Sequence, residues 1–259
     1  MIEFVEVTIE LSTMCPYSCQ HCSTWFSSYY DKDSDGETNE LSVEKVIDIA
    51  IEYIKGLKGI PVVVRFSGGE PMIFLETQIF VKVLKECDNI SGWIIATSGA
   101  MSFKDKFKSY NTNFGGVKNL SYRMSLYGNK EEHTLIMRNY EAFDYLIENA
   151  DILKNANIPF EFSTPIFFPS GVYHAVQIGK QFGVPVRLFR LLATPNVEPL
   201  HQVKQLWISR CAHLLYKKAY LTCSLYGECK TRCAYPKATV LATGKIIGCA
   251  MYKMKNMVV

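Results

Sequence analysis

The chain has 259 residues, of which 48% are hydrophobic and 20% charged, a composition typical of one globular domain with a small additional unit. This composition excludes an intrinsically disordered or collagen-like chain. The 28 basic and 25 acidic side chains give a formal net charge of +3, which provides no basis for nucleic-acid binding, because that needs a concentrated basic face.

Residues 1–11 alternate apolar and acidic side chains and lack the basic start and apolar run of a secretory signal. No window approaches the roughly 20 apolar residues that a membrane span needs. We therefore expect a cytoplasmic protein that does not enter the membrane. Its nine cysteines are then expected to be reduced thiolates rather than disulfides.

Six short runs rich in β-branched and aromatic residues predict strands. They span residues 4–10, 62–66, 93–97, 120–126, 160–164 and 186–191. Apolar residues at helical spacing lie between them, most clearly over 43–54 and 142–147. This alternation predicts an α/β fold of parallel strands with right-handed crossovers, a partial (β/α)6 TIM-like barrel that is not fully closed.

The pattern changes after residue 191. A helix is predicted over 203–219, and a cysteine-dense segment follows it. We therefore divide the chain into a barrel, residues 1–200, and a unit of residues 201–259 that contains the helix and a small cysteine-rich subdomain. In that subdomain, residues 239–243 and 245–249 flank Gly244 and predict a β-hairpin.

Three cysteines follow the first predicted strand directly, with the spacing C-x3-C-x2-C. Cys15, Cys19 and Cys22 could hold three corners of a cubane iron-sulfur cluster and leave the fourth iron open to an external ligand. Zinc is the first alternative, but the only nearby fourth ligand, His21, lies between two of the cysteines and is badly placed to bind. Buried cysteines without a metal are the second alternative.

A glycine-rich segment, Ser67-Gly68-Gly69-Glu70-Pro71, ends the second predicted strand. The glycines permit close backbone approach to a ligand, Pro71 stiffens the exit, and Glu70 could accept hydrogen bonds from a cationic amine. Alone, the segment could be an ordinary turn. Because the carboxyl ends of parallel strands face one crevice, we expect it to share a site with the cysteines.

The cysteine triplet and Gly68-Gly69-Glu70-Pro71 together resemble the signature of the radical S-adenosylmethionine (radical SAM) superfamily. Two further segments agree. Thr97-Ser98-Gly99 resembles the Thr-Asn-Gly of many members, and Ser125-Leu126-Tyr127-Gly128 resembles their Ser-Leu-Asp-Gly, with Tyr127 in place of Asp. The resemblance covers the chain from residue 4 to about residue 192.

The resemblance implies that Cys15, Cys19 and Cys22 ligate a [4Fe-4S] cluster whose open iron binds S-adenosylmethionine. It further implies a set of cofactor-binding residues: backbone near His21 at the adenine, Gly68, Gly69 and Glu70 at the methionine amine, Ser125 at the ribose, and Ser67, Pro71 and Thr97 in the same site. An electron donor such as flavodoxin or ferredoxin would reduce the cluster. Cleavage of the sulfonium would then release a 5'-deoxyadenosyl radical that abstracts hydrogen from a substrate.

Two arginines lie on the sixth predicted strand. Arg187 and Arg190 are three residues apart and point to opposite faces, so at most one faces the barrel lumen. If that residue is Arg190, it could bind the carboxylate of S-adenosylmethionine or of the substrate; a structural ion pair is the alternative.

Four cysteines remain near the C-terminus: Cys223, Cys229, Cys233 and Cys249. Cys233-x10-Gly244-x4-Cys249 resembles the opening of the SPASM and twitch extensions, which carry auxiliary iron-sulfur clusters. Ten residues follow Cys249, so we expect one such cluster at most. Zinc held by the same four thiolates is the alternative.

We expect an oxidoreductase or peptide-modifying enzyme that acts on a peptide or protein side chain. Residues 187–192 resemble the corresponding strand of peptide-maturing members. Radical oxidation or rearrangement of a small metabolite is the alternative. A zinc-stabilised binding module without enzymatic activity is a third hypothesis, but it leaves Gly68-Gly69-Glu70-Pro71 unexplained.

Overall fold

The computed structural model describes residues 4–19, 21–22, 39–106, 119–189, 200, 202–221 and 237–247. One sheet organises them, with the strand order β7-β6-β5-β4-β3-β2-β1-β8-β9. The strands are β1 (Val5–Glu10), β2 (Val62–Ser67), β3 (Ile90–Thr97), β4 (Leu120–Ser125), β5 (Phe160–Pro165), β6 (Val186–Phe189), β7 (Ala219–Leu221), β8 (Lys237–Val240) and β9 (Ile246–Ile247). All neighbours pair in parallel except β8 and β9.

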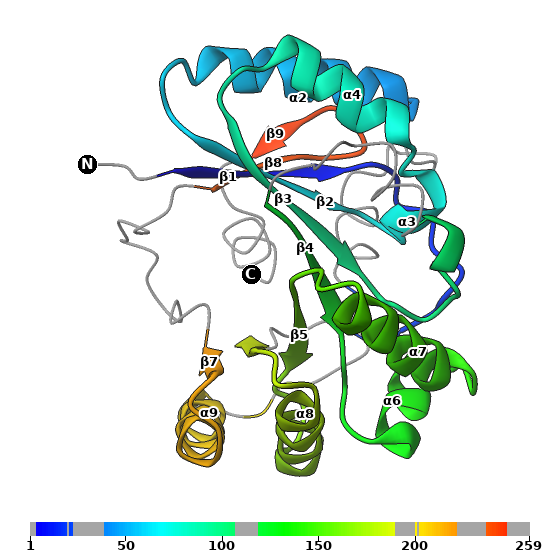
Figure 1. Ribbon diagram of the computed structural model, residues 1–259, viewed down its shortest axis with the longest axis vertical. Helices are drawn as coiled ribbons and strands as arrows, with labels where there is room; N and C mark the ends of the chain where they lie inside the picture. Colours follow the sequence, from blue (N-terminus) through cyan, green and yellow to red (C-terminus); the bar gives the residue numbers. More distant parts are fainter. Residues whose placement is uncertain are drawn as a thin grey trace.

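The helices surround the outside of the curved sheet (Figure 1). They are α2 (Val43–Gly56), α3 (Pro71–Phe74), α4 (Thr77–Glu86), α6 (Lys130–Met137), α7 (Ala142–Asn155), α8 (Pro169–Phe182) and α9 (Gln202–Leu215). Ser42 caps α2 by accepting from the Lys45 backbone N–H, as its position before the apolar periodicity predicts. None of the described helices is long and apolar enough to cross a membrane.

Side chains alternate between two faces along each strand. The outer face packs on the helices and forms the main core, as in the contact of Phe66 and Trp93 with Phe80 of α4. The opposite side, which we call the inner face, carries polar and charged residues. They include Glu6, Thr8, Arg65, Arg123, Ser125, Glu161, Ser163, Arg187 and Tyr220.

The six predicted strands and the α/β class are confirmed, and the sheet is open, as expected of a partial barrel. The number of strands is wrong, however. β7 and β8 also pair in parallel, so the parallel part has eight strands among the described residues. The predicted helix over 203–219 ends earlier, at Leu215, because Ala219 pairs with Val186 of β6.

The predicted C-terminal hairpin is present as β8 and β9, and Gly244 lies in its turn with a φ of 78°. It does not stand apart from the barrel: β8 pairs with β1, and the Leu41 N–H donates to Ala242 O at 2.9 Å. The four C-terminal cysteines lie outside the described residues. The cysteine-rich subdomain and the division at residue 200 therefore stay predictions.

Candidate active site

The loops that follow β1 and β2 are joined by backbone hydrogen bonds. The Leu11 N–H donates to Ser67 O at 3.0 Å, and the Gly69 N–H donates to Ser12 O at 2.7 Å. A third bond joins the Glu70 N–H to Met14 O at 3.1 Å. These bonds extend the pairing of β1 with β2 beyond the strands and bring the glycine-rich segment against the start of the cysteine loop.

Both glycines of this segment are required by the close approach of the two loops. A Cβ on Gly69 would lie 1.9 Å from Met14 O, and one on Gly68 would lie 2.3 Å from Ser12 O. Gly68 also has a φ of 121°, which side chains rarely tolerate. The glycines therefore admit the backbone of the cysteine loop, whereas the sequence alone indicates close approach of a ligand.

Glu70 is buried and fully engaged by protein donors. Its Oε1 accepts from Thr97 Oγ1 at 2.7 Å and from the Met72 N–H at 3.1 Å, while Oε2 accepts from the Ser98 N–H and hydroxyl. Burial raises the pKa of this carboxyl, and the bonds from Ser98 and Thr97 oppose that shift. Glu70 thus ties the end of β2 to the end of β3, a role that the sequence did not indicate.

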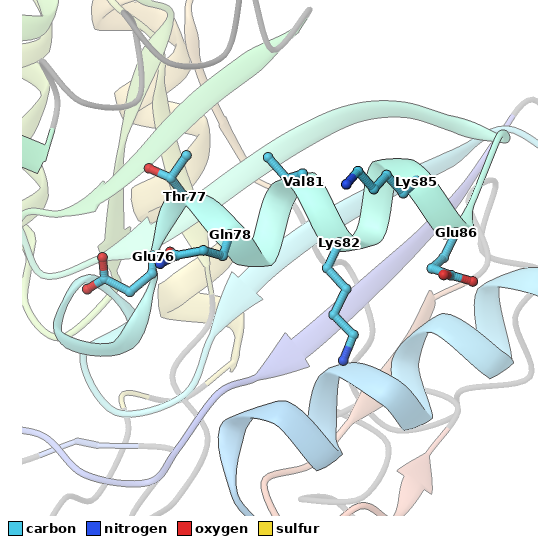
Figure 2. A pocket seen from close by; sticks show the side chains of 7 residues that line it. All are labelled: Glu76, Thr77, Gln78, Val81, Lys82, Lys85 and Glu86. Atoms are coloured by element: carbon cyan, nitrogen blue, oxygen red, sulfur yellow. The ribbon is translucent and has the colours of Figure 1, made fainter.

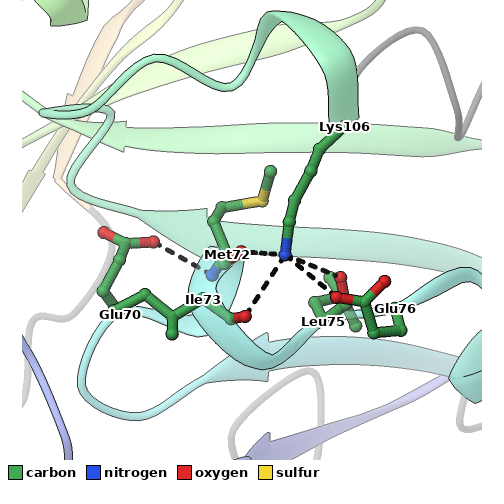
Figure 3. Close-up of polar contacts among 6 residues, drawn as sticks. All are labelled: Glu70, Met72, Ile73, Leu75, Glu76 and Lys106. Carbon is green, nitrogen blue, oxygen red and sulfur yellow. Dashed lines mark hydrogen bonds and ion pairs between the residues drawn. The ribbon is translucent and has the colours of Figure 1, made fainter.

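Helix α3, which follows Glu70, is held at its C-terminal end by Lys106 (Figure 3). The ammonium donates to Met72 O at 2.5 Å, Ile73 O at 3.2 Å and Leu75 O at 3.4 Å, and it pairs with Glu76 at 3.3 Å. A lysine that satisfies the last carbonyls of a helix is a common C-terminal cap. The segment after the glycines is therefore fixed at both of its ends.

The cysteine loop brings Cys15, Cys19 and Cys22 to the carboxyl end of the sheet, and all three are partly buried. Burial, with smaller contributions from the nearby cysteines and Glu70, raises the pKa of the Cys15 thiol to about 11 and that of Cys19 to about 12. Among the described residues, no three His, Cys, Asp or Glu side chains converge on a single-ion site. A cubane cluster does not need such convergence, because each thiolate binds a different iron.

Residues distant in the sequence hold the cysteine loop in place. The Thr13 N–H and the Ser12 hydroxyl both donate to the carboxylate of Glu40. On the other side, the Tyr17 hydroxyl donates to Ala100 O at 2.7 Å. Glu40 and Tyr17 carry no motif of their own, so the sequence did not indicate them.

His21 lies among aromatic rings. It packs edge-on against Tyr127 at 4.8 Å and against Phe167 at 4.9 Å, measured between ring centroids. Burial lowers the pKa of His21 to about 4, so the ring is neutral near pH 7. Its Nδ1 is buried without a hydrogen-bond partner among the described residues, and such an atom is available to a ligand.

The remaining predicted site residues have different surroundings. Thr97 is buried behind Glu70, and Pro71 begins α3. Ser67 is the last residue of β2, and Ser125 ends β4 beside Tyr127, whose pKa is raised well above its usual value, chiefly by burial. Arg190, Cys223, Cys229, Cys233 and Cys249 lie outside the described residues.

A surface pocket on α4 lies away from these loops (Figure 2). Its lining includes Lys82, which forms an ion pair with Asp48 of α2, and its other residues come from α4 and the turn before it. The pocket is on the helix-covered outside of the barrel. It does not adjoin the carboxyl ends of β1 and β2, where the cysteine loop and the glycine-rich segment meet.

The fold and site define an open α/β barrel with a three-cysteine loop and a glycine-rich loop paired at the carboxyl ends of neighbouring strands. A family model described as "Radical SAM superfamily" matches residues 9–171, more than half of the chain. The chain therefore belongs to the radical SAM superfamily. No curated protein matches it.

Solved structures of anSMEcpe share this fold. A histidine-tagged form of anSMEcpe with bound AdoMet is 16% identical, with a TM-score of 0.68, and the match covers 96% of this chain and 72% of that one. "Native anSMEcpe with bound AdoMet and Cp18Cys peptide" is 15% identical, with a TM-score of 0.67, and the match covers 95% of this chain and 73% of that one. At these identities the likeness concerns the fold.

Gly69→Ala tests the requirement for a side-chain-free loop contact. The added Cβ would collide with Met14 O and force the two loops apart, so iron content after anaerobic reconstitution should fall well below that of the wild type. Gly56→Ala is the matched control, because a Cβ at this last residue of α2 meets nothing within 4 Å. Wild-type iron content in Gly69→Ala, with helix content confirmed by circular dichroism, would contradict this interpretation.

Proposed function

We propose that this radical SAM enzyme modifies a side chain of a peptide or protein. The observation that carries the proposal is the match of 95–96% of the chain to structures titled with bound Cp18Cys and Kp18Cys peptides, at TM-scores of 0.67 and 0.66. The likeness of residues 187–192 to peptide-maturing members supports the same substrate class.

The residues present fit a [4Fe-4S] cluster with S-adenosylmethionine. Cys15, Cys19 and Cys22 would hold the cluster, and the orphaned Nδ1 of His21 offers a polar contact for the cofactor. When bound, this pair of groups supplies one-electron cleavage of a carbon-sulfur bond and thereby hydrogen abstraction from substrate.

The residues of the chain would position and shield these groups. The paired loops after β1 and β2 close one side of the site, and the rings around His21 close another. Because Glu70 already accepts four hydrogen bonds from the protein, we assign it to holding the end of β3, at Thr97 and Ser98, against the start of α3. The methionine amine would then meet backbone carbonyls of the glycine-rich segment, with Ser125 on the ribose side.

The decisive experiment follows deuterium from substrate into the cofactor product. Reconstituted enzyme, reductant and S-adenosylmethionine are incubated anaerobically with either the peptide fraction or the small-metabolite fraction of cells grown in deuterated medium. We expect deuterium in 5'-deoxyadenosine with the peptide fraction, and we expect its loss after peptidase treatment of that fraction. Label from the metabolite fraction alone would favour the small-metabolite alternative.

Cys22→Ala serves as the control for that experiment, because it should abolish formation of 5'-deoxyadenosine with every fraction. Formation of no 5'-deoxyadenosine by the wild type would overturn radical chemistry altogether. Flavodoxin or ferredoxin, which we propose as electron donors, can replace the chemical reductant.

We also propose that Cys223, Cys229, Cys233 and Cys249 hold an auxiliary iron-sulfur cluster, with zinc as the alternative. A variant with Cys15, Cys19 and Cys22 all changed to Ala should keep about four irons and four sulfides per chain after reconstitution. Retention of zinc, or of no metal, would contradict the auxiliary cluster. A variant that also lacks Cys233 and Cys249 is the control for adventitious iron.

A further inference from the structure

The inner face of the sheet carries a group of charged residues from five strands. Two of them form an ion pair between β2 and β1, where Arg65 Nη1 lies 3.2 Å from Glu6 Oε1. Two more pair between β4 and β5, where Arg123 Nε lies 2.6 Å from Glu161 Oε1. Arg65, Glu6, Arg123 and Glu161 all have side chains that are at least four-fifths buried. These four charges neutralise one another in pairs.

Arg187 of β6 differs from Arg65 and Arg123 in one respect: among the residues that the structure describes, it forms no ion pair. Its Nε is buried without a hydrogen-bond partner there, as is Nη1 of Arg123, which has Glu161 as its counterion. Glu161, on the neighbouring strand β5, is already bound by Arg123 and by the Tyr220 hydroxyl. Burial, together with the positive charges of Arg123 and Arg65, lowers the pKa of Arg187 to about 10.

An arginine in this environment is costly for the fold. It stays charged at neutral pH, is partly removed from water, and lies near two like charges without a carboxylate of its own among the described residues. Buried charged groups without a counterion are frequent at functional sites. A residue that served only stability would gain by being apolar here.

The strand register places Arg187 in the layer of the candidate active site. Arg187 is paired with Ser163 of β5, and Ser163 is paired with Ser125, the last residue of β4. Neighbouring strands are about 4.8 Å apart, so the Cα atoms of Ser125 and Arg187 are separated by about 10 Å. That distance is within the combined reach of an arginine side chain and a small ligand.

We propose that Arg187 binds a carboxylate of the substrate in the barrel lumen. This inference rests on the proposed function and adds that the substrate carries a carboxylate. The planar guanidinium can bind a carboxylate with two parallel hydrogen bonds. A substrate anchored in this way extends toward the cysteine loop at the carboxyl ends of β1 and β2. The side chain or terminus of a peptide, or a small carboxylic acid, would satisfy the same contact.

A carboxylate suits this position better than a phosphate. One guanidinium is unneutralised among the described residues, and it balances one negative charge. A phosphate monoester concentrates nearly two negative charges on one group at neutral pH, and this guanidinium would balance only one of them.

The test measures the binding of succinate and of its neutral isostere succinamide to the reconstituted enzyme in the presence of S-adenosylmethionine, by calorimetry at low ionic strength. We expect succinate to bind at least about tenfold more tightly than succinamide, because a charge-assisted pair is available only to the carboxylate. Arg187→Met should remove that preference, and Arg187→Lys should retain part of it because the charge remains. Arg210→Met, which removes an exposed arginine on α9, is the matched control and should bind succinate as the wild type does.

Thermal unfolding separates a binding residue from a structural one. Arg187→Met should raise the melting temperature by about 2–4 °C, because it removes an unneutralised buried charge. Arg123→Met should lower the melting temperature, because it leaves Glu161 without its cation. A lowered melting temperature in Arg187→Met would overturn the proposal, as would unchanged succinate binding in that variant.

An equal loss of S-adenosylmethionine affinity in Arg187→Met would also overturn the proposal, because the arginine would then serve the cofactor rather than the substrate. The proposed function is tested separately by the formation of 5'-deoxyadenosine by the wild type. Activity of the wild type together with succinate binding that does not depend on Arg187 would reject only this inference.

Discussion

The candidate site depends on one contact, the backbone pairing between the loops that follow β1 and β2. Gly69 and Glu70 donate to Ser12 O and Met14 O, and no side chain fits between the two loops. This pairing gives the cysteine loop a fixed neighbour at the carboxyl end of the sheet. Glu70 then connects the pair to the end of β3, and Tyr17 connects the cysteine loop to Ala100 beyond that strand. Three consecutive strand ends are thereby tied together around the position of the cysteines.

The sheet serves two purposes because its side chains alternate. The outer face is apolar and packs on the helices, so it carries the stability of the fold. The inner face does not provide this apolar packing and holds paired charges and hydroxyls. Arg187 is the exception within this pairing, since its charge is not neutralised by a described carboxylate. Arg187 lowers the stability of the fold, and we propose that it is retained because it binds substrate.

The sequence was sufficient for the strands β1 to β6 because each is a short run rich in β-branched and aromatic residues. It was insufficient for β7 and β8, whose three and four residues are too short to show a period and whose pairing depends on distant strands. The motifs located the cysteine and glycine loops, since both are local in sequence. Glu40 and Tyr17 were not predictable, because their partners lie 27 and 83 residues away and no pattern connects them. The orientation of Arg187 likewise followed only from the strand register.

We propose that the paired loops form one site for a cluster and S-adenosylmethionine. The most direct measurement is electron-nuclear double resonance on the reduced, reconstituted protein with S-adenosylmethionine labelled with ¹⁵N at its amine. We expect a ¹⁵N coupling to the cluster that is present in the wild type and absent in Gly69→Ala. A reduced cluster in the wild type that shows no coupling to the labelled amine would contradict it.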